Sequence, residues 1–544
     1  MRYICLLALL LSFSCAVRET QSVQTPLHII PRPVSVVGGG DNLQWDETVA
    51  IIVNGDQEQL VAELLQFYLK EKNITADISQ TSKDKDKITL ALGDLPDSVN
   101  GEGYRLTADD KGVRILASSG AGLFYGVQTL MQLIPAESTV IPFVDITDYP
   151  RFPYRGMHLD VGRHMFSVNF IKKYIDLLAR HKFNTFHWHL TEDQGWRIEI
   201  KKYPKLQEVA AFRKETVVGR ASTRTRNEPH EFDGQRYGGY YTTDEIREVI
   251  SFASARFVTI IPEIELPGHA MAALAAYPHL GCTGGPYETA TTWGIFPDVY
   301  CAGKDETFTF LQDVLDEVIA LFPSRYIHIG GDEVFNNYFK TSWETCPHCK
   351  KRMAEEGLQD PHELQSYFIR RVEKYLNSKG KQIIGWDEIL EGGLAPNATV
   401  MSWRGEAGGI AAARQQHDVI MTPEDWFYLD HAQDTVGEEP VIKRGYTPLK
   451  EVYAYDPVPA ELTGGEARHI LGAQGNVWTE YMKSPDQVEY MTYPRACAIA
   501  EVVWSPKAAR DYNNFLQRMQ THVGRLKGWN VNYSKHLEKE FAGR

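Results

Sequence analysis

The sequence is short of positive charge and of long apolar runs. Against 71 Asp and Glu residues it has only 57 Lys and Arg, which gives a formal net charge of −14. No Lys/Arg cluster recurs with interleaved aromatic residues, so no surface is expected to collect phosphates, and we expect no nucleic-acid partner. No apolar run reaches the roughly 20 residues that a membrane-spanning helix needs.

The first fifteen residues have the pattern of an export signal. A short start with the single cation Arg2 is followed by an apolar run at residues 4–11 and by a polar stretch that ends in Cys15. The small residue before Cys15 resembles a bacterial lipoprotein box, although Ser12 replaces the usual Leu three places upstream. We therefore expect an exported bacterial protein of the periplasm or outer membrane, either lipid-anchored at Cys15 or released by removal of the signal.

Cysteine is also scarce, with seven residues in the chain, two of them in the leader region. In an oxidising compartment Cys282 and Cys301 are candidates for a disulfide that closes a Gly/Pro-rich loop. Cys346 and Cys349 have the spacing of half a zinc site or of a redox pair, but no second CxxC or His cluster completes it in the sequence. A local disulfide or two plain thiols are therefore preferred here to a metal site.

The length of 544 residues exceeds what one hydrophobic core normally supports and predicts two domains. Residues 27–148 have the short strands and helices of a small α/β domain, with no acid, base and nucleophile at useful spacing. Residues 148–153 contain two prolines that break regular structure and mark a boundary. A catalytic domain over residues 149–520 and a C-terminal helical tail over residues 521–544 are expected to follow.

In the predicted catalytic domain, apolar strand-like runs alternate with amphipathic helical stretches about eight times. The expected strands are residues 156–160, 184–190, 258–263, 326–329, 382–385, 400–403, 418–421 and 470–474, with helices at 170–181, 243–256, 307–322, 361–379 and 408–416. The alternation predicts an α/β fold with a parallel sheet closed into a (β/α)8 TIM barrel. An open doubly wound sheet is the competing fold, but the Gly-rich phosphate turn typical of it is missing.

Polar and aromatic residues gather where these strands end, which is where a barrel builds its active site. In strand order they are Asp160 and Arg163; His189, Glu192 and Asp193; Glu263, Glu265 and His269; Asp332 and Glu333; Trp386, Asp387 and Glu388; Trp403 and Arg404; Tyr428 and Asp430; and Trp478 and Glu480. Acids, few cations and several indoles around one cavity are typical of a carbohydrate site.

The adjacent acids Asp332 and Glu333 are the main candidates for acid–base chemistry. Cleavage of a glycosidic bond needs a proton on the leaving oxygen and stabilisation of an oxocarbenium-like centre. Adjacent carboxylates repel each other, which favours one that keeps its proton. The longer side chain, Glu333, is expected to act as the general acid.

Metal-dependent hydrolysis is a weaker alternative. His187 and His189 lie on one face of a strand, because residues two apart in a strand point the same way. Zinc hydrolases of barrel type usually place such a pair on the first strand, add a Lys or a further His, and lack a ring of Trp. We therefore expect no metal and no cofactor.

Eight motifs in order carry a family resemblance. They are LDVGRH at 159–164, HWHLTEDQGWR at 187–197, PEIELPGH at 262–269, HIGGDE at 328–333, GWDE at 385–388, SWRG at 402–405, YLD at 428–430 and QGNVWTE at 474–480. With them the sequence closely resembles glycoside hydrolase family 20, the β-N-acetylhexosaminidases, and the N-terminal domain is similar to the one that precedes the barrel in that family.

The resemblance implies an exo-acting, retaining glycosidase that releases terminal β-linked GlcNAc or GalNAc from glycans or chitooligosaccharides. The substrate's own 2-acetamido oxygen attacks the anomeric carbon and forms an oxazolinium ion, so this family departs from the two-carboxylate scheme. Glu333 is implied as general acid and then base, Asp332 as the residue that orients the acetamido group, and Tyr428 as a hydrogen-bond donor to its oxygen. The implied binding residues are Trp386, Trp403 and Trp478 as walls, and Arg163, Asp430 and Glu480 for the sugar hydroxyls.

The loop after the second strand departs from the family pattern. That loop usually carries two aspartates, the first of which pairs with the histidine of Pro-Gly-His, but here the first position is Glu192. Because glutamate is one methylene longer, we expect its pairing with His269 to be displaced or reorganised. The rival interpretations are a relative that releases a disaccharide or a decorated sugar, and a glycan-binding lipoprotein built on an inactive barrel.

Overall fold

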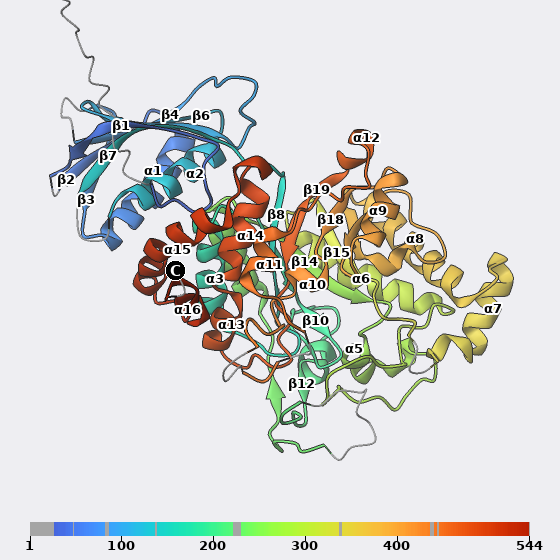
Figure 1. Ribbon diagram of the computed structural model, residues 1–544. Helices are drawn as coiled ribbons and strands as arrows, with labels where there is room; N and C mark the ends of the chain where they lie inside the picture. The colour runs from blue at the N-terminus through green and yellow to red at the C-terminus, as the bar shows by residue number, and fades with distance from the viewer. Residues whose placement is uncertain are drawn as a thin grey trace, which may run out of the picture.

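The computed structural model describes residues 27–46, 48–81, 86–135, 139–220, 230–336, 340–435, 440–442 and 445–542. The predicted signal and Cys15 lie outside these residues. The chain forms a sheet domain followed by a closed barrel (Figure 1). Among the helices of the described residues, none combines the length and the apolar composition that crossing a membrane requires.

The N-terminal domain is a seven-stranded mixed sheet in the order β1-β7-β5-β6-β4-β2-β3. Its strands are β1 (Ser35–Gln44), β2 (Thr48–Ile52), β3 (Thr75–Ser79), β4 (Lys87–Leu92), β5 (Tyr104–Asp109), β6 (Gly112–Ala117) and β7 (Val140–Asp148). Helices α1 (Asp56–Glu71) and α2 (Gly120–Leu133) pack on the sheet (Figure 1). The sheet and its two helices confirm the small α/β domain expected over residues 27–148. The edge strand β1 was not predicted, because its glycine-rich sequence is almost wholly exposed and has no hydrophobic alternation.

The eight predicted barrel strands are all present and close into a barrel, as predicted. They are β8 (Tyr154–Asp160), β9 (Thr185–His189), β14 (Thr259–Leu266), β15 (Tyr326–Gly330), β16 (Gln382–Trp386), β17 (Thr399–Ser402), β18 (Val419–Met421) and β19 (Ile470–Gly475). Every neighbouring pair is parallel, and β19 pairs with β8 to close the sheet. Ile261, Ile384, Met401 and Ile420 fill the barrel interior, so it is a packed core.

Helices surround the barrel (Figure 1). The five that were predicted are α3 (Val168–Arg180), α4 (Thr243–Ser254), α6 (Asp305–Leu321), α8 (Pro361–Ser378) and α9 (Ala407–Arg414), and α14 (Arg495–Trp504) follows β19. Local signals set their starts: Ser167 caps α3, and Thr242 with Glu245 forms a capping box on α4. The connecting loops hold β10 (Thr191–Glu192), β11 (Gly195–Trp196), β12 (Phe212–Arg213), β13 (Tyr237–Gly238), α5 (Met271–Ala276), α7 (Pro347–Glu356), α10 (Glu424–Phe427), α11 (Leu449–Ala454), α12 (Gly464–Ala467) and α13 (Pro485–Thr492).

The N-terminal domain packs at the end of the barrel where the strands begin. Glu102 of that domain pairs with Arg155 on β8 at 2.8 Å and accepts a hydrogen bond from Asn184, just before β9. A second link is fully buried: the Lys182 ammonium lies 2.8 Å from the Asp148 carboxylate, which also accepts a hydrogen bond from Tyr104. The ends of the strands, where the predicted site residues follow, therefore lie on the side of the barrel away from the N-terminal domain.

The last helices complete this interface. Helix α15 (Tyr512–Gly528) is continuous across residue 520, where the sequence analysis placed the end of the barrel, and α16 (His536–Ala542) follows it. Arg518 donates to the Ile29 carbonyl and Arg525 to the Gln132 carbonyl, both in the N-terminal domain. Arg518 also forms a 2.6 Å ion pair with Glu501 of α14. Helix α15 contacts both domains, so its residues after 520 are packed against the rest of the protein and do not form a separate tail.

Candidate active site

Asp332 and Glu333 follow β15 through two glycines in the left-handed region. Gly330 has φ +66°, and a Cβ on it would lie 1.8 Å from a carboxylate oxygen of Glu265, so no larger residue fits there. Glu333 itself has φ +53°, a strained value for a side chain of its size. The Asp332 side chain is 13% exposed and that of Glu333 is 26% exposed, so both reach the open end of the barrel.

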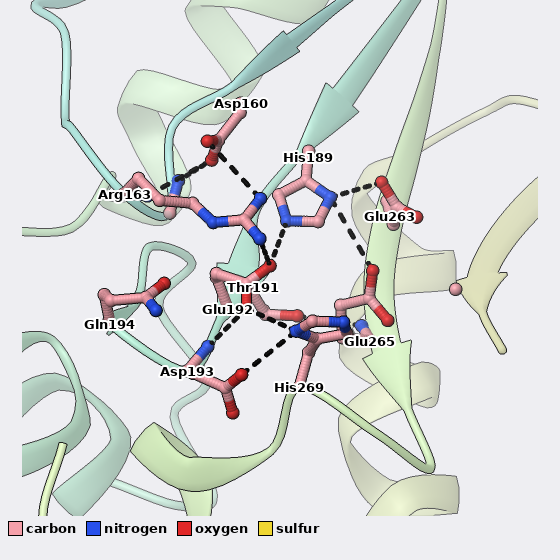
Figure 2. A network of polar contacts seen from close by, with 12 residues as sticks. Asp160, Arg163, His189, Thr191, Glu192, Asp193, Gln194, Glu263, Glu265 and His269 are labelled. Carbon is pink, nitrogen blue, oxygen red and sulfur yellow. Dashed lines mark hydrogen bonds and ion pairs between the residues drawn. The ribbon is translucent and has the colours of Figure 1, made fainter. Parts of the chain in front are cut away.

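The His269 ring contacts both of these acids. Its Nε2 is 3.4 Å from a carboxylate oxygen of Asp332 and 3.4 Å from one of Glu333. Its Nδ1 is 2.7 Å from Glu192 and 3.0 Å from Asp193 (Figure 2). Burial lowers the pKa of His269, but Glu192 and Asp332 outweigh it and raise the pKa well above the usual value. A histidine cation therefore joins two pairs of acids.

The glutamate at position 192 keeps the contact with His269 and gains others. One carboxylate oxygen faces His269, while the other is 2.9 Å from Arg163 and 3.1 Å from His189 (Figure 2). Burial raises the pKa of Glu192, but Arg163 and His269 hold it well below its usual range. Asp193 supplies a second carboxylate to His269, and burial raises its pKa to about 6. The expected reorganisation is thus a shared contact, since both acids reach the same ring nitrogen.

Glu263 is the centre of a buried layer that the sequence analysis did not assign. His187 lies 3.0 Å from its carboxylate, His328 lies 2.7 Å away, His189 also contacts it, and Trp386 donates to it at 2.9 Å. Burial raises the pKa of Glu263, but His328 and His189 hold it well below the usual range. The sequence did carry a signal, because an acid inside a fully buried strand needs several partners.

His189 lies between two carboxylates and gives a prediction for the pH dependence of stability. Burial lowers its pKa, but Glu263 and Glu192 outweigh this and raise it to about 10. A raised folded-state pKa stabilises the fold fully below the unfolded-state pKa of about 6.5, and this stabilisation is lost as the pH rises towards 10. In urea unfolding between pH 6.5 and 10, we expect the free energy of unfolding of His189→Asn to fall with pH less steeply than that of the wild type. The two slopes should differ by at most about 1.4 kcal/mol per pH unit.

The control for this experiment is His279→Asn at an exposed position. It should keep the wild-type slope, whatever its absolute stability. Equal slopes in the wild type and in His189→Asn would show that His189 is neutral in the folded protein.

Four aromatic residues from four different strand ends form a box. The rings of Trp403 and Tyr428 stack at 6.0 Å with an interplanar angle of 16°. Trp478 lies 5.8 Å from Trp386 and 6.1 Å from Tyr428, measured between ring centroids. The indole of Trp403 is fixed by a 2.9 Å hydrogen bond to Glu388. Flat rings held in this way present the apolar walls that a sugar ring and a methyl group would contact.

Several buried polar atoms at this end have no hydrogen-bond partner among the described residues. They are Oδ1 of Asp332, Nε of Arg163 and Oε2 of Glu265. Such atoms cost about 1–3 kcal/mol each, so a group of them at one strand edge is typical of a ligand site. Glu265 was not assigned a role from sequence; burial, Asp332 and Glu263 raise its pKa well above the usual range.

The two remaining predicted binding residues lie at the same end. Burial lowers the pKa of Arg163, but the charges of Glu192, Asp160 and Glu480 raise it well above its usual value. Glu480 is therefore close enough to Arg163 for the two charges to interact. Burial and then Asp430 raise the pKa of Tyr428. The eleven predicted catalytic and binding residues therefore come from every barrel strand and gather at one end of the barrel.

The predicted disulfide between Cys282 and Cys301 is wrong. Both are free thiols, as are Cys346 and Cys349. The reason is that two loops converge: the Cys301 sulfur is 3.7 Å from the sulfurs of both Cys346 and Cys349, and the Cys282 sulfur is 3.8 Å from that of Cys349. The second half of a four-cysteine group, which no CxxC motif supplies, thus comes from the loop after β14.

Comparison with protein-family models gives two matches that cover most of the chain. Residues 152–507 match the model for the glycosyl hydrolase family 20 catalytic domain. The chain belongs to this family. Residues 27–149 match the model for domain 2 of the same family. The resemblance drawn from the eight motifs is confirmed.

Known relatives are similar to this chain in sequence and in structure over most of its length. A beta-hexosaminidase of Porphyromonas gingivalis is 47% identical over 558 residues, which cover 99% of this chain and 69% of that protein. The structure of an exo β-N-acetylglucosaminidase from Vibrio harveyi, in complex with N-acetylglucosamine, superposes with a TM-score of 0.83 at 34% identity, covering 94% of this chain and 79% of that one. A β-N-acetylhexosaminidase from Bacteroides fragilis gives 0.79 at 30% identity, covering 93% and 96%.

Proposed function

We propose that this family 20 enzyme removes terminal β-linked N-acetylhexosamine from glycans or chitooligosaccharides, with the 2-acetamido group of the substrate as nucleophile. One observation carries the proposal: the Asp332–Glu333 pair, with an unpartnered buried Asp332 oxygen, lies at the strand ends that hold the box of Trp386, Trp403, Tyr428 and Trp478. An acetamido group has an N–H for that oxygen and a methyl group for the indoles. The N-acetylglucosamine bound to the Vibrio harveyi relative supports the choice of sugar.

In the first step, Glu333 gives its proton to the glycosidic oxygen while the acetamido carbonyl oxygen attacks the anomeric carbon. The aglycone leaves as an alcohol, and an oxazolinium ion forms. Asp332 accepts a hydrogen bond from the acetamido N–H and stabilises the positive charge that grows on that nitrogen. The Tyr428 hydroxyl donates a hydrogen bond to the acetamido carbonyl oxygen. The indoles of Trp386 and Trp478 hold the attacking oxygen close to the anomeric carbon. The attack is therefore intramolecular and already positioned, which lowers its entropic cost.

In the second step the Glu333 carboxylate takes a proton from water, and the oxygen of that water attacks the anomeric carbon. The oxazolinium ring opens, the acetamido group is restored, and the sugar leaves with its β configuration retained. Glu333 ends protonated, ready for another cycle. No enzymic nucleophile takes part.

His269 acts in this scheme as a positioning residue. Its Nδ1–H is held by Glu192 and Asp193, which directs Nε2–H towards Asp332 and Glu333. A cation in this place keeps the two neighbouring carboxyl groups together in spite of their repulsion.

Arg163, Asp430 and Glu480 are proposed to bind the hydroxyls at the non-reducing end. The Nε of Arg163 is a buried donor without a hydrogen-bond partner among the described residues, and it fits such a hydroxyl. Arg163 also lies 5.1 Å from the centroid of the Trp478 ring, so this end is joined to the aromatic box. A pocket closed here admits only a terminal sugar, which makes the enzyme exo-acting.

The dependence on an acetamido group tests the proposal. We expect purified protein to release p-nitrophenol from the β-GlcNAc glycoside, and from the β-GalNAc glycoside if the 4-hydroxyl is tolerated. With the matching β-glucoside, which has a hydroxyl in place of the acetamido group, we expect kcat/KM to fall by at least about 10³-fold, because the positioned nucleophile is missing.

Comparable cleavage of the β-glucoside would overturn the substrate-assisted mechanism. Release from none of these substrates, together with binding of N-acetylglucosamine, would favour a glycan-binding barrel. A disaccharide glycoside as the sole substrate would indicate a wider pocket than we propose.

We further propose that the chain is exported and that Cys15 carries a lipid or is removed with the signal. The support is the leader pattern alone, with its apolar run at residues 4–11. Cell fractionation with metabolic labelling by a fatty acid distinguishes the two, since only the anchored form would be labelled and membrane-bound.

A further inference from the structure

A group of four cysteines joins two loops beside the active site. The four-cysteine cluster consists of Cys282 and Cys301, in the loop after β14, and Cys346 and Cys349, at the start of α7 in the loop after β15. All four sulfurs lie within 4.8 Å of one another. Cys301, Cys346 and Cys349 are buried, and Cys282 is partly exposed.

The separations between the sulfurs fit a tetrahedral metal site. Zinc–sulfur bonds of about 2.3 Å in a tetrahedron place the sulfurs about 3.8 Å apart. Here the separations are 3.7 Å from Cys301 to Cys346, 3.7 Å from Cys301 to Cys349, and 3.8 Å from Cys282 to Cys349. Because Cys301 is equally close to two partners, the geometry does not single out a pair for a disulfide.

The backbone around the cluster is fitted to this approach. Gly281 pairs with Tyr300 in an isolated bridge, and the Cys301 amide donates to Leu280 at 2.8 Å, which brings Cys282 and Cys301 together. A Cβ on Gly303 would lie 2.5 Å from the backbone nitrogen of Cys349, so only glycine lets the loops come this close. The Trp343 indole then donates to the Tyr300 carbonyl at 2.8 Å and locks one loop on the other.

We propose that the four-cysteine cluster binds one Zn²⁺ ion in a closed, structural site that ties the loop after β14 to the loop after β15. Four protein sulfurs complete the coordination, so the ion has no open position for a substrate or a water molecule. The ion has a structural role and takes no part in the reaction. One loop begins with His269 and the other with Asp332 and Glu333, so the ion holds together the two segments whose side chains meet at 3.4 Å in the site.

Metal content of the intact protein tests the proposal. Protein expressed with zinc in the medium and purified without a chelating resin should contain about one zinc per chain by elemental mass spectrometry. The double variant Cys346→Ser/Cys349→Ser should lose it, because half of the ligands are gone. Cys497→Ser is the matched control: this thiol is buried and lies 3.4 Å from His181, outside the cluster, and its loss should leave the zinc in place.

Thiol chemistry separates the possible states of the wild type, even if the double variant does not fold. With zinc bound, the four thiols should resist alkylation in the native protein and react after denaturation with a chelator and without reductant. Substitution by Co²⁺ should give the visible absorption of a tetrahedral thiolate site. Four reactive thiols and no metal in the native protein, or thiols that react only after reduction, would each overturn the proposal, the second by showing two disulfides.

This test does not depend on the hydrolase activity. Zinc content and alkylation are read without substrate, so the proposed function can fail while the metal site stands, and the reverse. If both hold, removal of the ion should raise KM and lower the midpoint of thermal unfolding together, because the loops that carry the acids are loosened.

Discussion

Glu333→Gln is expected to lower kcat/KM for an alkyl β-GlcNAc glycoside by about 10²–10⁴-fold, the usual range for the loss of a general acid. The amide has nearly the shape of the carboxyl group but cannot give up a proton to the leaving oxygen. With a dinitrophenyl aglycone, which leaves without protonation, the first step should be much less affected. Measurement of kcat/KM on both substrates shows the difference.

Glu461→Gln serves as the control, because Glu461 is an exposed glutamate that is not among the site residues. It should leave both rates unchanged. If Glu333→Gln lost the same factor with good and poor leaving groups, Glu333 would not be the proton donor. In that case Glu265, whose pKa is raised by burial, would be the next candidate.

Asp332→Asn is expected to lower kcat by about 10²–10³-fold, the range found when one group that stabilises transition-state charge is removed. The amide can still approach the acetamido N–H, but it brings no negative charge to the nitrogen that becomes positive. In contrast to Glu333→Gln, the loss should be similar for the alkyl and the dinitrophenyl glycoside, because formation of the oxazolinium ion is impaired with either. Steady-state kinetics on the two substrates measure this.

The matched control is Asp110→Asn, at an exposed turn of the N-terminal domain. Near-wild-type kcat in Asp332→Asn would show that the charge on Asp332 is dispensable. The acetamido group would then be oriented by Tyr428 and the tryptophans alone.

The sequence predicted the barrel well because its buried strands are rich in apolar residues and alternate with amphipathic helices about eight times. It also placed Asp332, Glu333 and the tryptophans at strand ends, since motif position along a strand is a local property. The edge strand β1 was missed because its glycine-rich sequence is almost wholly exposed and has no alternation of apolar and polar residues. Contacts between separate strands could not be derived from spacing, and this is why the role of Glu263 and the sharing of His269 by Glu192 and Asp193 appear only in three dimensions.

The cysteines show the same limit. Cys282 and Cys301 are neighbours in the sequence of one loop, which favoured a disulfide between them. The second loop brings Cys346 and Cys349 to them across 45 residues or more, a proximity that depends on how β14 and β15 stand side by side in the barrel. Long-range pairing is what a single sequence conveys least.

The buried pair between Lys182 and Asp148 makes the N-terminal domain inseparable from the enzyme. Lys182 belongs to the barrel, three residues before β9, and its only compensating charge at hydrogen-bond distance among the described residues comes from the last residue of β7. Leaving such a cation without its partner costs about 3–5 kcal/mol, a large part of the stability of an ordinary domain. We therefore expect the two domains to unfold as one cooperative unit, and we expect the barrel to be unstable without the sheet domain.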